Sequence, residues 1–221
     1  MRVYYFTDAQ SALSNIALRR IKVSRVEDLN DPFELLGVDV SDKRYRPAFR
    51  KTRGDINRDK GLICFSKSWR NPLLWGHYAQ KHTGICLGFD VPDHLLVSVI
   101  YAKRLLKMAI DPKTKRPKPT EDDIDKLLRT KFFDWKYEDE MRCFVRLNHE
   151  TEVESGRHFY SFSEHLELRE VVLGLQCELP IQGVRRIVAD CKPSVKVLKA
   201  RISFTRFEVR ESKSASRERK A

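Results

Sequence analysis

Hydrophobic positions along this chain follow two periods, which predict short strands in some segments and amphipathic helices in others. From Glu140 onward apolar and polar side chains alternate, which is typical of a strand buried on one face. Residues 195–209 predict a long final strand or a hairpin. Compact apolar runs flanked by polar residues favour further strands, and they lie at residues 3–6, 62–66, 85–89 and 170–174.

Helices are expected where apolar residues recur every three or four positions after a capping residue. Thr7 and Gln10 form a capping-box sequence, so we expect a helix with Thr7 as its N-cap that ends at Arg19 and Arg20. Residues 181–189 predict a late helix of the same kind.

Two further helices are marked by strong start signals. Asn71 followed by Pro72 opens a helix that we expect to run through His82 and to stop at Gly84. Thr120 opens another, and the apolar stripe expected along it is Ile124, Leu127, Leu128, Phe132 and Trp135.

The order of these elements mixes helices and strands without a regular βαβ alternation. This predicts an α+β fold with mixed or antiparallel sheets and flanking helices. The 221 residues are 41% hydrophobic, which is enough to build one sizeable core. We therefore expect a single domain over residues 1–211, followed by a disordered basic tail at residues 212–221.

The net charge of +12 favours polyanionic partners such as RNA or DNA. Residues 43–60 contain eight basic and two acidic side chains, and we expect a mobile surface segment or a basic helix there. Residues 111–118 are rich in proline and lysine and predict an exposed loop. These two segments would supply the surface that binds nucleic acid.

The sequence favours a cytoplasmic protein with no membrane partner. No run approaches eighteen apolar residues, and the chain starts with a strand-like segment, so neither a membrane span nor a secretory signal is expected. The five cysteines are scattered without a C-x-x-C pair, which predicts reduced thiols. His77 and His82 are five residues apart, a spacing that does not support a zinc site. The oligomeric state stays open.

Candidate chemistry is concentrated at the acidic entry to the strand that begins at Glu140. Glu138 and Glu140 would share one face of an extended chain, beside Arg142. Crowding of like charges raises the pKa of one carboxyl group and a nearby arginine lowers it, so such groups suit acid–base work or the stabilisation of a cation. An exposed acidic strand entry explains the same residues without any chemistry.

Several motifs together resemble a bacterial family catalogued as a domain of unknown function, over roughly residues 3–205. They are Leu29-Asn30-Asp31-Pro32-Phe33-Glu34, Cys64-Phe65-Ser66, Leu74-Trp75-Gly76-His77-Tyr78-Ala79 with His82, Gly84 and Cys86, and Trp135-x-Tyr137-Glu138-x-Glu140-x-Arg142. The order of elements in turn resembles the ADP-ribosyltransferase superfamily. That resemblance implies an ADP-ribosyltransferase-like fold and an enzyme that cleaves NAD and transfers ADP-ribose to a macromolecular acceptor such as a nucleic acid. Such an activity would suit a role in phage defence or as a toxin.

The resemblance also assigns residues to roles. Tyr4 or Arg2 from the first strand and Ser66 from a second strand would hold NAD. Glu140 at the start of a third strand would stabilise the oxocarbenium character that develops as the nicotinamide–ribose bond breaks. Ser66 is equally explained as an ordinary residue at the end of a strand.

Further residues complete the expected site. Glu138 would act as general base toward the acceptor, and Arg142 would orient the carboxylates or hold the pyrophosphate. His77 and Tyr78 are candidate ligand contacts, although Tyr78 also fits a core stripe and His77 a structural role. We further expect Tyr78 and His82 to share a hydrogen bond.

The turn at Asn30 and Asp31 either shapes the nucleotide pocket or is an Asx-type turn that holds two strands in place. Two other functions remain open. The chain is alternatively a nucleic-acid-binding module without catalysis, in which the basic segments bind and the carboxylates are structural. A magnesium-dependent nuclease using Glu138, Glu140 and Asp31 ranks last, because no further acidic partner stands at a recognisable spacing.

Overall fold

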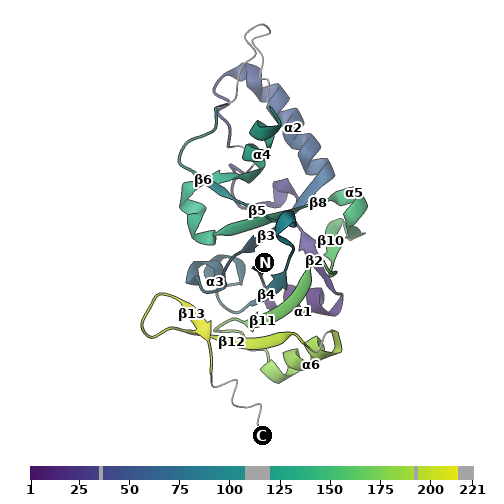
Figure 1. Cartoon of the computed structure of the whole chain (residues 1–221), viewed down its shortest axis with the longest axis vertical. Helices are drawn as coiled ribbons and strands as arrows, with labels where there is room; N and C mark the ends of the chain where they lie inside the picture. The colour runs from purple at the N-terminus through teal and green to yellow at the C-terminus, as the bar shows by residue number, and fades with distance from the viewer. Residues whose placement is uncertain (35–36, 108–119, 192–193, 214–221) are drawn as a thin grey trace.

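The computed structural model describes residues 1–34, 37–107, 120–191 and 194–213. The described residues have an α+β fold built on an eight-stranded sheet (Figure 1). Its strands, in spatial order, are β13 (Val209–Glu211), β12 (Lys196–Ile202), β11 (Glu167–Leu173), β4 (Ile85–Asp90), β1 (Arg2–Thr7), β3 (Lys60–Ser66), β8 (Glu140–Arg146) and β5 (Val97–Ser98).

Antiparallel pairing dominates this sheet. Within it β11 and β12 are parallel, and the other neighbouring strands are antiparallel. Two smaller sheets flank it, one with the order β2 (Arg20–Val23), β10 (Arg157–Ser161), β9 (Glu152–Glu154), and one that pairs β6 (Ile100–Ala102) with β7 (Thr130–Phe132) in parallel. The expected α+β class with a mixed, mostly antiparallel sheet is confirmed.

Helices lie beside the middle strands of the main sheet and at both ends of the molecule. Figure 1 shows α2 and α4 at one end of the long axis and α6 at the other, with α1 and α3 near the middle strands. The helices are α1 (Ala9–Ala17), α2 (Arg46–Asp59), α3 (Pro72–Tyr78), α4 (Glu121–Arg129), α5 (Leu147–Glu150) and α6 (Ile181–Cys191), with 3₁₀ turns η1 (Val26–Asp28), η2 (Lys43–Tyr45), η3 (Asp93–Leu95) and η4 (Phe133–Glu138). None of the described helices is long and apolar enough to cross a membrane.

The central strands are buried on both faces. On β1, Val3 and Tyr5 pack into the large core that includes Ile16 of α1, whereas Tyr4 and Phe6 pack into a second cluster around Trp75. Side chains of a strand point alternately to opposite faces, so β1 separates the two clusters. This burial explains the continuous apolar runs, because a strand covered on both sides has no solvent face that requires polar residues.

Several helix boundaries differ from expectation because strand pairing takes precedence over helical propensity. Thr7 does not cap α1: it stays in β1 opposite Ile85, and Asp8 caps the helix by accepting from the Ser11 amide at 2.8 Å. The helix ends at Ala17 rather than at Arg19 and Arg20, and Arg20 already belongs to β2.

The helix expected to reach His82 is also shorter. Asn71 caps α3 as predicted, with its side chain accepting from the Leu73 amide at 3.0 Å, but the helix ends at Tyr78. His82 has a left-handed backbone with φ of 71° and stacks on Trp75, so the expected Tyr78–His82 hydrogen bond does not form. The chain turns early because Gly84 must pack directly against the backbone of β1.

The helix capped by Thr120 ends at Arg129, so the expected apolar stripe is interrupted. Phe132 belongs to β7 and Trp135 to η4, because residues 130–132 pair with β6. The cap expected at Thr120 is confirmed, with the Thr120 hydroxyl accepting from the Asp123 amide at 3.1 Å.

The basic segment at residues 43–60 is mainly the helix α2, one of the two expected forms. Residues 195–209 form a hairpin of β12 and β13. Backbone pairing extends one residue into the expected tail, since the Ser212 amide donates to the Lys199 carbonyl at 2.7 Å. The loop at residues 111–118 and the tail at residues 214–221 lie outside the described residues.

Candidate functional site

Three of the predicted site residues lie side by side on adjacent strands. Tyr4 of β1 is the register partner of Ser66 on β3, and Ser66 is the register partner of Glu140 on β8. Directly paired residues of antiparallel strands project to the same face, with Cβ atoms about 4.5–5.5 Å apart. Residues separated by more than a hundred positions in the sequence therefore form one row across the sheet.

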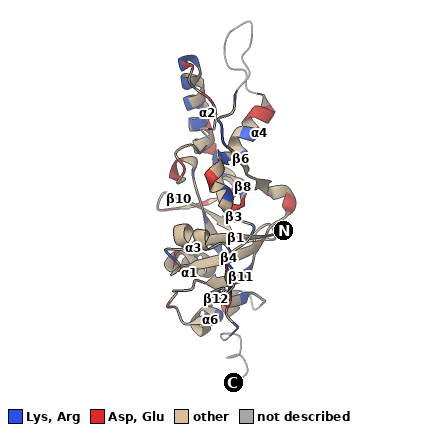
Figure 2. Ribbon diagram, turned by 90° about the vertical axis from the view of Figure 1, so that its left-hand side faces the viewer, with Lys and Arg blue, Asp and Glu red and all other residues tan. Residues whose placement is uncertain are grey.

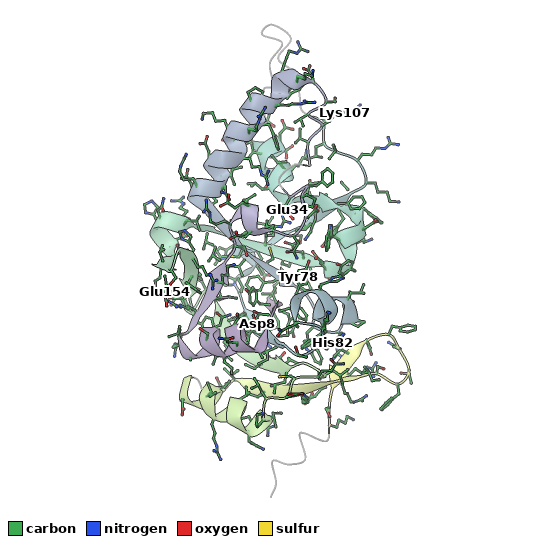
Figure 3. The ribbon with its side chains drawn as sticks, turned by 180° about the vertical axis from the view of Figure 1, so that it is seen from behind. Asp8, Glu34, Tyr78, His82, Lys107 and Glu154 are labelled. Carbon is green, nitrogen blue, oxygen red and sulfur yellow. The ribbon has the colours of Figure 1, made fainter. Side chains whose placement is uncertain are left out.

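This row borders a cavity of about 200 Å³. Figure 3 shows Glu34 and Tyr78, two of its lining residues, in the middle part of the molecule. Of the predicted site residues, those that line the cavity are Tyr4, Asn30, Ser66, Tyr78, Glu138 and Glu140. Arg2, Asp31, His77 and Arg142 do not belong to its lining.

The two glutamates meet at a lysine and do not share an extended strand. Glu138 ends η4, and Asp139 has a left-handed backbone with φ of 44°, so the chain turns before β8 begins at Glu140. The expected extended geometry was therefore wrong, yet the carboxylates still converge. Lys131 Nζ lies 2.5 Å from Glu138 Oε2 and 2.9 Å from Glu140 Oε2.

Arg142 supports Glu140 from the buried side. Its Nε donates to Glu140 Oε1 at 2.8 Å, its Nη1 donates to the Leu128 carbonyl at 2.8 Å, and its Nη2 lies 2.6 Å from Glu34 Oε1. All of its nitrogens thus contact the protein, and the side chain is fully buried. The geometry suits the orientation of carboxylates, and it presents no nitrogen to a pyrophosphate in the cavity.

The electrostatic surroundings separate the two glutamates. Burial alone would raise the pKa of Glu140, but the charges of Arg142 and Lys131 outweigh it and lower this pKa to about 2. Glu138 has the opposite balance, because burial dominates over the attraction of Lys131 and raises its pKa above the usual value. The site therefore contains one firmly ionised carboxylate and one that accepts a proton more readily.

Tyr78 connects helix α3 to this pair. Its hydroxyl donates a hydrogen bond to Glu138 Oε1. Burial and the charge of Glu138 raise the pKa of Tyr78, which keeps the hydroxyl protonated as a donor. His77 is on the exposed side of the same helix, where its ring lies 5.9 Å from that of Tyr137.

Of the two first-strand candidates, Tyr4 lines the cavity and Arg2 does not. Its hydroxyl donates to Glu170 Oε2 at 3.2 Å, and burial together with Glu170 raises its pKa to about 12. Its register partner on β4 is Gly88, and a Cβ atom at that position would approach the Tyr4 ring to 3.0 Å, so the absence of a side chain there leaves room for the ring. Arg2 instead pairs with Asp90 at 2.6 Å.

The turn at Asn30 and Asp31 is both an Asx-type turn and part of the cavity wall. Asp31 Oδ1 accepts from the Phe33 amide at 2.9 Å, as in an Asx-type turn, while Asn30 lines the cavity. Ser66 is similar: it lines the cavity, and its hydroxyl donates to the Ser68 carbonyl at 3.1 Å.

Two central residues were not predicted as members of the site. Glu34 lines the cavity and pairs with Arg142, and Lys131 joins the glutamates. Glu34 had a signal, since it ends the Asn-Asp-Pro-Phe-Glu motif. Lys131 had none, because its place follows from the pairing of β7 with β6.

The described residues contain no group of three or more histidine, cysteine, aspartate or glutamate side chains arranged to hold a metal ion. The ammonium group of Lys131 already lies between the glutamates that a nuclease would use. Asp31, the third ligand considered for such an enzyme, does not line the cavity.

Comparisons with known proteins relate part of the chain to a protein family. No curated protein and no solved structure is significantly similar to the chain. Residues 74–143 match a family described as "Protein of unknown function (DUF2971)". This segment runs from α3 into β8, so it contains Tyr78, Lys131, Glu138, Glu140 and Arg142, whereas Tyr4 and Ser66 precede it. The expected resemblance to a domain of unknown function is confirmed, and the segment that carries the candidate acidic residues is similar to the DUF2971 family.

Proposed function

We propose that this protein is an ADP-ribosyltransferase-like enzyme, which cleaves NAD and transfers ADP-ribose to a macromolecular acceptor. The observation that carries the proposal is the row of Tyr4, Ser66 and Glu140 on three adjacent strands beside a cavity. The resemblance drawn from the sequence implies this juxtaposition.

The chemistry requires negative charge beside the ribose. When the bond between C1′ and the nicotinamide nitrogen breaks, its electron pair leaves with nicotinamide and positive charge develops on the ribose. Three carboxylates (Glu34, Glu138 and Glu140) face two cations (Lys131 and Arg142), so the fully ionised cluster carries one excess negative charge. This charge is fixed in place before the reaction, and such preorganisation is what lowers the barrier.

The second half of the reaction needs a base. The acceptor attacks C1′ with a lone pair and gives up a proton as the new bond forms. Glu138 is suited to receive this proton, because its raised pKa makes it the more basic of the two glutamates. Its hydrogen bond from Tyr78 holds the carboxylate in one orientation.

The volume of the cavity suits only part of the proposed substrate. Its volume of about 200 Å³ is below the roughly 300–1,000 Å³ of pockets that enclose a whole drug-sized ligand. We assign it to the nicotinamide riboside end of NAD, with the adenylate end outside. Ser66 and Asn30 supply hydrogen-bonding groups there, and Tyr4 and Tyr78 supply aromatic surface.

The test measures nicotinamide release from NAD in the presence of RNA, DNA or cell lysate. We expect Glu140→Gln to abolish release while its thermal unfolding remains cooperative. The matched control is Asp139→Asn, which removes the exposed carboxylate between the two glutamates, and asparagine tolerates the left-handed backbone there. Release should also fall as pH drops through the raised pKa of Glu138. A folded Glu140→Gln variant with full activity, or a wild-type protein inert toward NAD, would refute the proposal.

A nucleic-acid-binding module without catalysis remains the second candidate, and helix α2 favours it. None of its residues is buried, and Figure 2 shows basic residues, coloured blue, along its length. In that case the protein should bind RNA or DNA with the same affinity after Glu140→Gln and should release no nicotinamide.

A further inference from the structure

Two exposed phenylalanines mark the connection between β12 and β13. Phe204 is 85% exposed and Phe207 is fully exposed, and neither belongs to an apolar cluster of the described residues. Figure 1 shows this yellow connection projecting from the sheet beside α3. Exposed aromatic rings at the tip of a hairpin contribute nothing to the core, and they expose apolar surface to water, which favours a binding role.

Basic side chains surround these rings. The guanidinium of Arg201 lies 5.2 Å from the centre of the Phe204 ring, and Arg206 lies between the two phenylalanines in the sequence. A groove of about 540 Å³ runs beside the hairpin and is lined by Arg70, Arg201, Glu208, Arg210, Glu211 and Lys213.

Part of this positive charge is not neutralised. Arg210 pairs with Glu208. In the part of the chain that the structure describes, Arg70, Arg201 and Arg206 have no ion pair with a carboxylate. The surface therefore combines unpaired arginines with two exposed aromatic rings.

We propose that this hairpin surface (Arg70, Arg201 and residues 204–207) binds single-stranded nucleic acid. Bases stack on exposed aromatic rings irrespective of sequence, and arginines contact the phosphates. The charge argues for a polyanion rather than for an apolar protein partner, and a duplex would keep its bases stacked on one another, away from Phe204 and Phe207.

The hairpin is tied to the candidate active site by residues 67–71. The Val209 amide of β13 donates to the Arg70 carbonyl at 2.8 Å. At the other side of this loop, Asn71 Nδ2 donates to the Tyr137 carbonyl at 2.7 Å, and the Lys67 amide donates to the Asp139 carbonyl at 3.2 Å. Single-stranded nucleic acid bound to the hairpin would thus lie beside residues 67–71, the loop that is hydrogen-bonded to the turn between Glu138 and Glu140. This location makes single-stranded nucleic acid the acceptor class, a step that rests on the proposed function, whereas binding itself does not.

The experiment measures fluorescence anisotropy of a labelled twelve-nucleotide oligothymidylate and of a duplex of equal length, a size within the range of roughly 4–16 nucleotides for such sites. We expect the wild type to prefer the single strand. Phe204→Ala with Phe207→Ala should weaken binding about tenfold or more, and Arg201→Gln should weaken it to a smaller extent. The matched controls are Val153→Ala, which removes an exposed apolar side chain on β9, and Arg157→Gln on β10. Both should bind as the wild type does.

Several outcomes would overturn the proposal. They are equal affinity for the duplex, unchanged affinity of the double phenylalanine variant, absence of binding by the wild type, and a dimer in light scattering that the two phenylalanine substitutions dissociate. The last result would identify a second copy of the chain as the occupant. The binding measurements contain no NAD, so they test the hairpin proposal independently of the enzyme proposal. A protein that binds the oligonucleotide here but releases no nicotinamide in the separate NAD assay would refute the enzyme proposal alone.

Discussion

Lys131 determines the geometry of both candidate catalytic glutamates. Its ammonium group contacts Glu138 and Glu140, and it lies 3.9 Å from Glu34. Removal of this cation would leave buried carboxylates facing one another, and the loss of one partner from a buried ion pair is strongly destabilising. The strength of these contacts is also visible in Lys131 itself: burial lowers its pKa, but the three carboxylates outweigh burial and raise it.

We therefore predict that Lys131→Met lowers the free energy of unfolding by about 3–5 kcal/mol. Urea denaturation at neutral pH measures this change. Lys136→Met is the control, because Lys136 is exposed on the neighbouring 3₁₀ turn and has no carboxylate partner among the described residues. A loss of stability no larger than that of the control would show that Lys131 is not required to hold the glutamates together.

The sequence identifies the acidic residues of the candidate site better than the residues that surround them. Glu138, Glu140 and Ser66 are recognisable because they belong to local motifs. Lys131 belongs to no motif, and its role depends on a parallel strand pair formed by residues 100–102 and 130–132. The left-handed turn at Asp139 was missed for a similar reason, since alternation of side chains from Glu140 favours an extended chain and gives no sign of the turn before it.

Helix α3 is short, and its last residue holds one of the candidate catalytic glutamates. It has seven residues, begins at a Pro72 capped by Asn71, and ends at Tyr78, whose hydroxyl holds Glu138. Asn71 makes two contributions, because its oxygen caps the helix and its nitrogen holds the Tyr137 carbonyl. The start of α3 and the turn before Glu138 are thereby joined.

We predict that Asn71→Ala costs about 1–2 kcal/mol of stability through loss of the cap and also lowers NAD cleavage. Thr120→Ala is the matched control, since it removes the cap of α4, which has no residue at the cavity. Thermal unfolding and nicotinamide release measure the two effects. Similar loss of stability in both variants with equal activity would mean that the bond to Tyr137 does not position Glu138.

Starts of elements were more predictable than ends. Asn71 and Thr120 are caps recognisable from the sequence and both are confirmed, whereas the cap predicted at Thr7 lies one residue later, at Asp8. The ends of α1, α3 and α4 were misplaced because each is decided by a distant partner: β2 pairs with β10, Gly84 packs on β1, and β7 pairs with β6.

The whole molecule is basic, but its charge is unevenly distributed. Figure 2 shows basic residues, coloured blue, along α2, at the opposite end of the molecule from α6. Arg46, Arg50 and Arg53 have no ion pair with a carboxylate in the described part of the chain, whereas Lys51 and Arg58 pair with Asp55. This surface adds a long-range attraction for polyanions that is separate from stacking on the hairpin.

We predict that replacing Arg46, Arg50 and Arg53 by glutamine weakens nucleic-acid binding and reduces the dependence of log K on log salt. Each phosphate contact contributes roughly 0.7 to this slope on a single strand, so the loss should not exceed about 2. The control replaces Lys81, Arg157 and Arg186, which are exposed on other elements. Anisotropy titrations at several salt concentrations measure the slope, and equal slopes for the two variants would exclude a specific role of α2.

The strand order of the main sheet was beyond what the sequence predicts. Individual strands are visible as apolar runs, but the order β1-β3-β8 depends on long-range pairing that local patterns do not encode. The row of Tyr4, Ser66 and Glu140 could be named from a resemblance, while its register needed the structure.

This strand order has a consequence for synthesis of the protein. Residues 2–7 and 60–66 leave the ribosome well before residues 140–146, which must add to their edge to complete the row. A nascent or truncated chain that stops before Glu138 contains Tyr4 and Ser66 without either glutamate. For an enzyme that consumes NAD, copies halted before that point would lack the catalytic carboxylates, and activity could begin only after residues 140–146 have joined the sheet.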